Sequence, residues 1–139
     1  MLVIRPMSSC LLNVHRVGPV EKILAINKST ARPSFGIVGG KSEPGESPEE
    51  TCVRETFEET GLTFNSNELV LIYAAVAKKY FSFVYAPLHP VDVSIPLIQS
   101  NEGQPTWVYW NDLTFASRSP YFEFNQGLKQ AWLNYLKDI

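Results

Sequence analysis

The chain has 139 residues, two cysteines and a formal net charge of −2. This length fits one domain, over 1–139, that buries a core without a disulfide framework, so Cys10 and Cys52 are expected to be buried free thiols. The slightly acidic balance argues against a nucleic acid polymer as partner, and no apolar run reaches the length of a membrane span. Because Arg5 and Pro6 interrupt the first apolar stretch, no signal peptide is expected and the predicted location is cytoplasmic.

Apolar segments and turn signals predict the elements in chain order. Strands are expected at 8–14, 22–26 and 37–38, a helix at 48–60, strands at 68–77, 79–86 and 106–110, and a final helix at 125–136. This order favours an α+β fold over a doubly wound parallel sheet. Prolines break the region 87–105 into loops, and this region is interpreted as either a substrate lid or part of a dimer contact.

The helix at 48–60 carries its own start and stop signals. Ser47 is a good N-cap, Pro48 suits the first helical position, and Glu50 completes a capping box with Ser47. Gly61 suits the left-handed residue that ends a helix.

Three glutamates near the end of this helix are placed against its dipole. Glu55, Glu58 and Glu59 are spaced i, i+3, i+4, so they share one face, and the last two lie in the last turn, where acid is disfavoured. One interpretation is a solvated acidic face on which Arg54 pairs with glutamates four residues away. The other is a metal site, because Mg²⁺ and Mn²⁺ bind carboxylate oxygens and would offset the repulsion.

The spacing around these glutamates decides between the two. Gly40 is followed after five residues by Glu46 and, after seven more, by the run Arg54-Glu55-Thr56-Phe57-Glu58-Glu59-Thr60-Gly61-Leu62. This resembles the signature of the Nudix hydrolase family, Gly-x5-Glu-x7-Arg-Glu-U-x-Glu-Glu-x-Gly-U, where U is a bulky aliphatic residue. Every fixed position matches, and only Thr56 departs from an aliphatic position. The resemblance implies an α/β/α sandwich around a mixed sheet, with the catalytic loop–helix–loop at 40–62 and a C-terminal helix.

The resemblance also implies roles for individual residues. The metal-ligand positions are matched by Gly40, through its backbone carbonyl, and by Glu55, Glu58 and Glu59. Arg54 matches the arginine that orients the catalytic carboxylates, and Glu46 matches an acid that supports the loop. The general base differs across the family, and Glu55 is the first candidate here.

A further acid lies outside the helix. Residues 102–107 read Glu-Gly-Gln-Pro-Thr-Trp and look like the loop of the MutT-type branch that ends in a Trp and supplies another metal carboxylate. The alternative for Glu102 is an exposed loop glutamate ahead of an edge strand.

Four residues outside the signature are candidates for substrate binding. Asn125 resembles in position an asparagine of the MutT-type branch that reads an oxidised guanine, and an amide offers both a donor and an acceptor; alternatively it is the N-cap of the terminal helix. Lys28 either faces substrate phosphates or is a solvated strand-end lysine. Phe35 either stacks on a nucleobase or belongs to the core. Tyr80 resembles a marker of members that cleave dinucleoside polyphosphates, or it packs within its strand.

We therefore expect a Mg²⁺- or Mn²⁺-dependent hydrolase of nucleoside diphosphate derivatives. The favoured reaction converts a (d)NTP or an oxidised (d)NTP to NMP and pyrophosphate, and the alternative is dinucleoside polyphosphate hydrolysis. A nucleotide-binding sensor without catalysis is a third possibility, but such domains usually lose the glutamates or the arginine that this chain keeps. The expected partner is a small nucleotide, without nucleic acid or membrane, and a homodimer is possible.

Overall fold

The computed structural model describes residues 5–29, 31–89, 93 and 97–139. The predictions that rest on Pro90 and Pro96 therefore lie outside the described residues. The strands are β1 (Met7–Leu11), β2 (Val14–Val17), β3 (Val20–Asn27), β4 (Phe35–Ile37), β5 (Gly39–Lys41), β6 (Leu69–Ala77), β7 (Tyr80–Pro87) and β8 (Gln104–Tyr109). The helices are α1 (Pro48–Thr60), α2 (Trp110–Thr114) and α3 (Phe122–Lys137), with a short 3-10 helix η1 (Ser66–Glu68).

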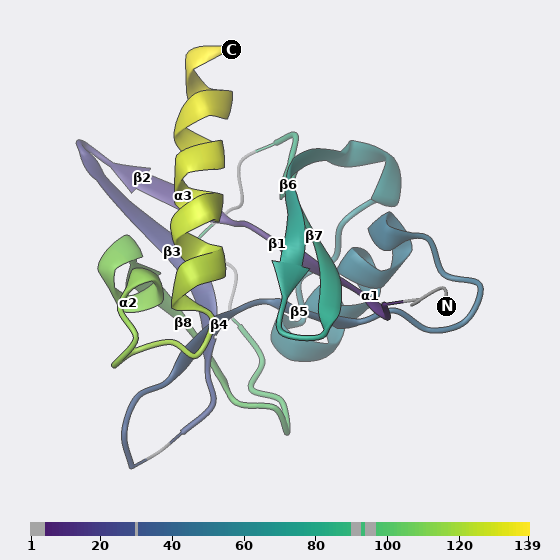
Figure 1. Ribbon diagram of the computed structural model, residues 1–139, viewed down its shortest axis with the longest axis horizontal. Helices are drawn as coiled ribbons and strands as arrows, with labels where there is room; N and C mark the ends of the chain where they lie inside the picture. The colour runs from purple at the N-terminus through teal and green to yellow at the C-terminus, as the bar shows by residue number, and fades with distance from the viewer. Residues whose placement is uncertain (1–4, 30, 90–92, 94–96) are drawn as a thin grey trace.

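The strands divide into two sheets rather than forming the single mixed sheet that was expected (Figure 1). The first has the order β5-β1-β7-β6 and is mixed, because β1 runs parallel to β7 and antiparallel to β5. In the second, β3 pairs with β8 along one edge and with β2 and then β4 along the other. A backbone bond from Leu24 N to Asn13 O, 3.0 Å long, ties β3 to the segment that follows β1.

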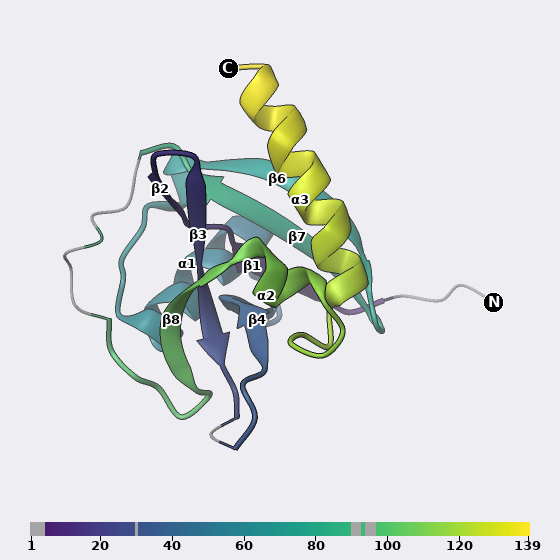
Figure 2. The same ribbon diagram turned by 90° about the vertical axis from the view of Figure 1, so that its left-hand side faces the viewer.

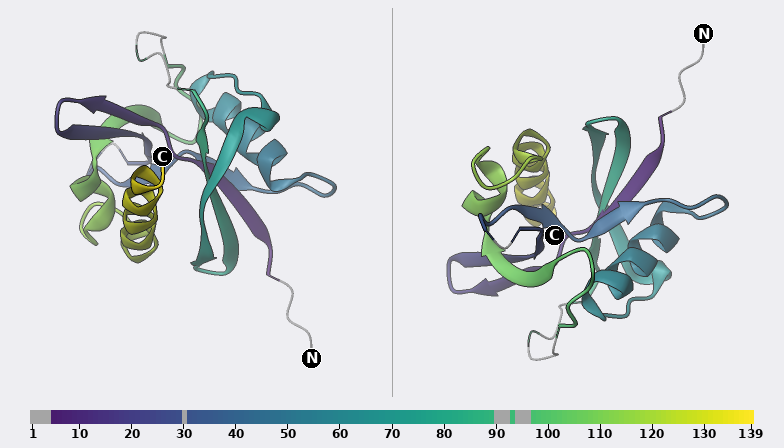
Figure 3. Two further views of the ribbon diagram at one scale, coloured as in Figure 1. Left: turned by 90° about the horizontal axis from the view of Figure 1, so that it is seen from above. Right: turned by 90° about the horizontal axis from the view of Figure 1, so that it is seen from below.

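Helices cover both sides of the first sheet. Figure 3 shows α1 and α3 on opposite sides of it, with α1 packed on β1 and β5 and α3 packed on β6. Figure 2 shows α2 and the start of α3 beside β3, β4 and β8. The predicted α+β class is confirmed, with a helix layer on each side of a mixed sheet.

The main core lies between the second sheet, the inner part of the first sheet and α3. Its buried members come from strands and helices throughout the chain: Leu12, Ile23, Ala25, Phe35, Val84, Val108, Trp110, Leu113 and Leu128. A smaller cluster joins α1 to the first sheet through Leu11, Cys52 and Tyr85. Both cysteines are free, with Cys52 buried as predicted and Cys10 partly buried.

Several predicted boundaries are corrected by the fold. The strand expected at 8–14 is two strands, because the chain leaves β1 after Leu11 and pairs again only from Val14. Trp110 begins α2, which was not predicted, instead of ending a strand. Helix α3 starts at Phe122, so Asn125 lies inside the helix and is not its N-cap. No helix in the described part of the chain is long and apolar enough to cross a membrane.

Candidate active site

Helix α1 forms as its sequence predicts and thereby fixes the glutamates. Ser47 Oγ accepts from Glu50 N at 3.1 Å, and the Glu50 carboxylate accepts from Ser47 N at 2.9 Å. At the other end Gly61 has φ 79° and donates its N–H to Phe57 O. The helix runs from Pro48 to Thr60, so all three signature glutamates lie in its second half.

Arg54 is the centre of a hydrogen-bond network at the face of α1. Its Nε donates to Glu46 Oε2 at 2.6 Å, and one terminal nitrogen donates to Glu55 Oε1 at 3.0 Å and Glu58 Oε2 at 3.2 Å. The other terminal nitrogen donates to Lys41 O at 3.0 Å. One guanidinium therefore joins the loop before α1 to two of the helical glutamates, the geometry expected of an arginine that orients carboxylates.

Glu46 is held in this network as an anion. Its carboxylate accepts from Arg54, from Glu43 N at 2.9 Å and from Thr51 Oγ at 2.9 Å. Hydrogen bonds from Arg54 and then from the Glu43 backbone lower the pKa of Glu46 to about 2. Glu46 thus supports the loop by binding it to α1.

Glu55, Glu59 and Glu102 come together at the edge of α1. Each has a carboxylate oxygen within 4.8 Å of an oxygen of the other two, although Glu102 is far from the helix in sequence. Glu59 is 1% exposed, and its Oε1 accepts from Gly39 N at 2.7 Å. Burial, with Glu102 beside it, raises the pKa of Glu59 to about 8, and burial also raises the pKa of Glu55 although Arg54 opposes this. Three clustered carboxylates, two of them buried, fit a hard divalent cation.

The other predicted ligands are placed differently. A Cβ at Gly40 would overlap the Glu55 carboxylate, so glycine lets this strand lie against the cluster without displacing Glu55 from its bond with Arg54. Glu58 has a half-exposed side chain bound to Arg54, and it is not among the three carboxylates whose oxygens lie within 4.8 Å. The structure therefore groups three of the four predicted carboxylate ligands and leaves Glu58 at the rim.

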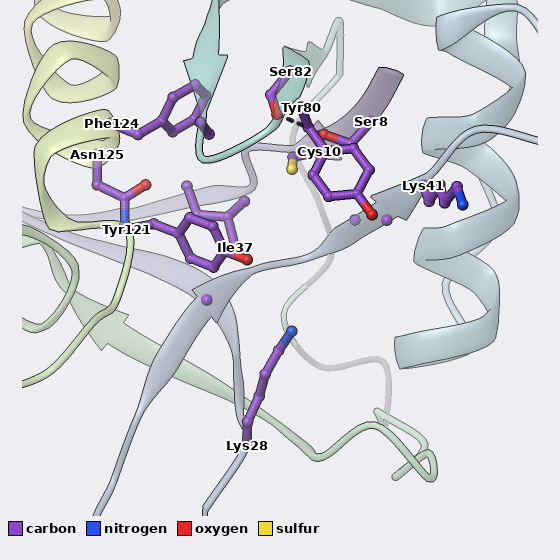
Figure 4. Close-up of a pocket in the computed structure, with 14 residues that line it drawn as sticks. Ser8, Cys10, Lys28, Ile37, Lys41, Tyr80, Ser82, Tyr121, Phe124 and Asn125 are labelled. Carbon is purple, nitrogen blue, oxygen red and sulfur yellow. Dashed lines mark hydrogen bonds between the residues drawn. The ribbon is translucent and has the colours of Figure 1, made fainter. Parts of the chain in front are cut away.

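A pocket of about 200 Å³ lies on the opposite side of β5 from α1 (Figure 4). Its walls come from the first sheet, the end of β3, β4 and the start of α3: Ser8, Cys10, Lys28, Gly36, Ile37, Gly39, Gly40, Lys41, Ala77, Tyr80, Ser82, Tyr121, Phe124 and Asn125. Gly39 and Gly40 belong to this wall and also contact the glutamates. The pocket and the carboxylate cluster are therefore two parts of one site.

Three of the four predicted substrate-binding residues line the pocket. Lys28 extends its amine into it from the end of β3, and Tyr80 lines it from β7 (Figure 4). Phe35 does not line it, since its ring is only 9% exposed and packs in the main core. The stacking role for Phe35 is wrong, because a ring enclosed by core side chains leaves no face for a nucleobase.

Asn125 is buried at the start of α3 with its amide orientation fixed. Its Nδ2 donates to Leu113 O at 2.9 Å and to Ser119 Oγ at 3.3 Å, and the residue is 2% exposed. Figure 4 shows its carbonyl oxygen on the pocket side. Both amide hydrogens are engaged, so Asn125 presents an acceptor to the pocket instead of the donor and acceptor expected from the sequence.

Sequence reasoning missed the aromatic and hydroxyl groups of the pocket. Tyr121 has Lys78 Nζ 4.7 Å from its ring centre, and Ser8 and Ser82 share a hydrogen bond across adjacent strands. Cys10 faces the same space, but burial raises the pKa of its thiol to about 12, so it is a poor nucleophile. The pairing of β1 with β7 brings Ser8 beside Ser82, and the packing of α3 on β6 brings Tyr121 beside Lys78. No local pattern signals either contact.

Comparison with known proteins identifies the family. The NUDIX domain model matches residues 10–129, and the chain belongs to this family. It is thus a hydrolase of the Nudix family, whose members generally use divalent metals. A sequence search against curated proteins finds no match.

Solved structures share the fold at low identity. A MutT protein from Methanosarcina mazei Go1 has a TM-score of 0.65 and 24% identity, covering 90% of this chain and 93% of that one. An Ap4A hydrolase binary complex from C. elegans has a TM-score of 0.66 and 19% identity, covering 96% and 99%. A MutT/nudix family protein from Enterococcus faecalis has a TM-score of 0.63 and 18% identity over 77% of this chain, which spans 44% of that longer chain.

Proposed function

We propose that the chain is a Mg²⁺- or Mn²⁺-dependent nucleoside triphosphate pyrophosphohydrolase that converts a (d)NTP or oxidised (d)NTP to NMP and pyrophosphate. The observation that carries this proposal is the glutamate cluster on one side of β5 and the pocket on the other, joined by Gly39 and Gly40. The Glu102 loop and Asn125 at the pocket support the choice of substrate, and the fold is shared with a MutT protein. The expected partner is a small nucleotide; the cytoplasmic location and a homodimer stay predictions from the sequence.

Each residue of the site has a separate proposed role in metal binding, proton transfer or phosphate binding. Glu55, Glu59 and Glu102 would hold the cation, which when bound neutralises phosphoryl oxygens and acidifies a water molecule. Arg54 keeps the Glu55 and Glu58 carboxylates in place, and Glu55 is the first candidate to accept the proton of the attacking water. Lys28 supplies a cationic side chain at the pocket end of β3, where it can contact a phosphate.

The base would occupy the pocket under the start of α3. Tyr80, Tyr121 and Phe124 offer ring surfaces, and the fixed Asn125 carbonyl accepts a hydrogen bond from an N–H on the base edge. Because Asn125 offers only an acceptor, it favours a base whose edge presents a hydrogen-bond donor at that point, instead of one whose edge presents both a donor and an acceptor.

Dinucleoside polyphosphate hydrolysis is the second candidate. Tyr80 lies in the pocket, and a C. elegans Ap4A hydrolase shares the fold over nearly its whole length. A sensor without catalysis is the candidate of another class, and the intact network of Arg54 with Glu46, Glu55 and Glu58 argues against it.

A nucleotide screen with product analysis tests the proposal. Nucleoside triphosphates, oxidised triphosphates and dinucleoside polyphosphates are incubated with Mg²⁺ or Mn²⁺, and NMP with pyrophosphate is the expected product pair. Glu59→Gln should lower turnover at least about a hundredfold while the fold persists, since it removes a carboxylate of the cluster. Glu58→Gln should also lower turnover, because Arg54 loses one of the charged carboxylates that hold its guanidinium in place. The matched control Glu123→Gln, an exposed helical glutamate, should keep it.

The outcomes separate the candidates. Full activity in both Glu58→Gln and Glu59→Gln under limiting Mg²⁺ would contradict the site. Cleavage of dinucleoside polyphosphates alone would favour the second candidate. Tight nucleotide binding with no hydrolysis of any substrate would favour the sensor.

A further inference from the structure

Two lysines at the tip of the β6–β7 hairpin are held against the wall of the pocket. Ala77 pairs with Tyr80, so Lys78 and Lys79 form the whole turn between the two strands. Lys78 Nζ lies 4.7 Å from the centre of the Tyr121 ring, and Lys79 Nζ lies 5.5 Å from the centre of the Tyr80 ring. Both tyrosines line the pocket (Figure 4), so the two amines lie beside it, on residues that remain exposed to a ligand.

These amines have no carboxylate partner in the described part of the chain. The ion pairs among the described residues are made by Arg16, Arg54 and Arg118, and none involves a lysine. Among the same residues no carboxylate lines the pocket, whereas Lys28 and Lys41 do. The pocket side of β5 is therefore cationic, although the chain as a whole has a formal net charge of −2. A concave surface with cations of one sign attracts an anionic ligand.

The hairpin lysines and Lys28 lie at different ends of the pocket. Burial raises the pKa of Glu59, and the positive charge of Lys28 opposes this rise, so Lys28 lies near the glutamate cluster. A phosphate bound by Lys28 would therefore also be near the proposed cation site. The hairpin continues β7, which β1 separates from β5, and two strand spacings amount to about 10 Å. The hairpin tip is thus too far from the β5 glycines to bind the next phosphate of the same diphosphate.

We propose that the substrate carries a second phosphate, on the 2′ or 3′ hydroxyl of its ribose, and that Lys78 and Lys79 bind it. This inference deepens the proposed function and rests on it, because it takes the reacting diphosphate to lie beside the glutamate cluster. A ribose separates such a phosphate from the 5′ chain, so one nucleotide reaches both cationic places, and the flexible lysine stems close the remaining distance. Two neighbouring amines suit a phosphate dianion, since lysine binds phosphate as a point charge. A dinucleoside polyphosphate would instead present its phosphates in one continuous chain.

Calorimetric binding to the full chain with Mg²⁺ tests the proposal with probes that share a base. Adenosine 5′-phosphate is compared with adenosine 2′,5′-bisphosphate and 3′,5′-bisphosphate, and the guanosine set is measured alongside. The wild-type chain should bind one of the bisphosphates at least about tenfold more tightly than the monophosphate. Combining Lys78→Gln with Lys79→Gln should remove this advantage and leave monophosphate binding little changed. The matched control is Lys22→Gln, whose amine lies 5.5 Å from the centre of the Tyr109 ring on the second sheet, and it should keep the advantage. Circular dichroism verifies that each variant is folded.

The outcomes separate this inference from the proposed function. Equal affinities for the monophosphate and both bisphosphates in the wild type, or an advantage that survives in the double lysine variant, would overturn the inference. So would a double variant that loses affinity for diadenosine tetraphosphate alone, because the second phosphate would then belong to a polyphosphate chain. Hydrolysis of nucleoside triphosphates without a bisphosphate advantage would leave the proposed function standing and remove only the second phosphate. A bisphosphate advantage that depends on both lysines, in a chain that hydrolyses no nucleotide, would support the binding site and contradict the hydrolytic function.

Discussion

At the scale of single residues, the proposed ligand Glu59 should couple metal binding to pH. Its pKa is raised to about 8 by burial and by Glu102, so below that pH a cation must displace a proton. We expect the affinity for Mn²⁺, measured by calorimetry, to rise about tenfold per pH unit below 8 and to level off above it. Glu59→Gln should bind weakly and lose the slope, whereas Glu123→Gln should keep it. A flat profile in the wild type would contradict the assignment of Glu59 as a ligand.

Asn125 should matter for stability as well as for substrate preference. Asn125→Ala leaves the buried Leu113 carbonyl without its donor, which we expect to cost about 1–3 kcal/mol in the free energy of unfolding, measured with urea. The same variant should change the ratio of kcat/KM values among bases, because the pocket loses its fixed acceptor. Gln126→Ala, whose longer hydrogen bond to Thr114 O is only partly buried, is the control. An unchanged base preference would confine Asn125 to a structural role.

At the scale of elements, α1 offers two buried threonines with opposite expected effects. Thr51 Oγ donates to Glu46, whereas Thr56 Oγ lies beside the Cys52 thiol and has no nitrogen or oxygen partner within hydrogen-bond range in the described structure. Thr56→Val should therefore stabilise the fold by about 1 kcal/mol, since it removes a buried unpaired hydroxyl at nearly constant volume. Thr51→Val should lower the free energy of unfolding by about 1–2 kcal/mol and also lower turnover through Glu46. Urea denaturation of the pair measures the contrast, and destabilisation by Thr56→Val would show that its hydroxyl is satisfied.

The elements also show which parts of the fold the sequence predicts. Helix α1 was bounded correctly because Ser47, Glu50 and Gly61 are local signals that act within one turn. The break at Asn13 and the start of α3 at Phe122 were missed, because strand pairing and helix packing override the local pattern there. An asparagine near a predicted helix start, such as Asn125, indicates an N-cap. The buried hydrogen bond from Asn125 to Leu113 O forms only in the folded chain, so the sequence does not predict it.

At the scale of the whole molecule, the candidate site was partly predictable. The signature glutamates could be named because their spacing on α1 is fixed by the helix. Glu102 joins them only through the pairing of β3 with β8, and Lys28 reaches the pocket only because β3 ends there. The pocket walls, including Tyr121 and Ser82, come from segments whose meeting no local pattern encodes.

Glu21 ties the second sheet to both C-terminal helices. Its carboxylate accepts from Trp110 Nε1 of α2 at 2.9 Å and from Trp132 Nε1 of α3 at 3.0 Å, besides an ion pair with Arg16. Burial favours the protonated acid, but the hydrogen bonds from Trp132, Arg16 and Trp110 outweigh it and lower the pKa of Glu21. The folded state therefore prefers the charged form of this side chain.

Glu21→Gln should consequently destabilise the whole fold in a pH-dependent way. At neutral pH we expect a loss of about 1–3 kcal/mol in the free energy of unfolding, because two indole donors lose a charged acceptor. A carboxyl whose pKa is lowered on folding stabilises above its unfolded pKa, and this stabilisation is lost as the pH falls through the folded value. The difference between wild type and variant should therefore shrink in acid. Urea denaturation followed by tryptophan fluorescence measures it, with the exposed Glu123→Gln as control. A difference that stays constant from neutral pH into acid would show that packing, and not the charge of Glu21, holds the two helices to the sheet.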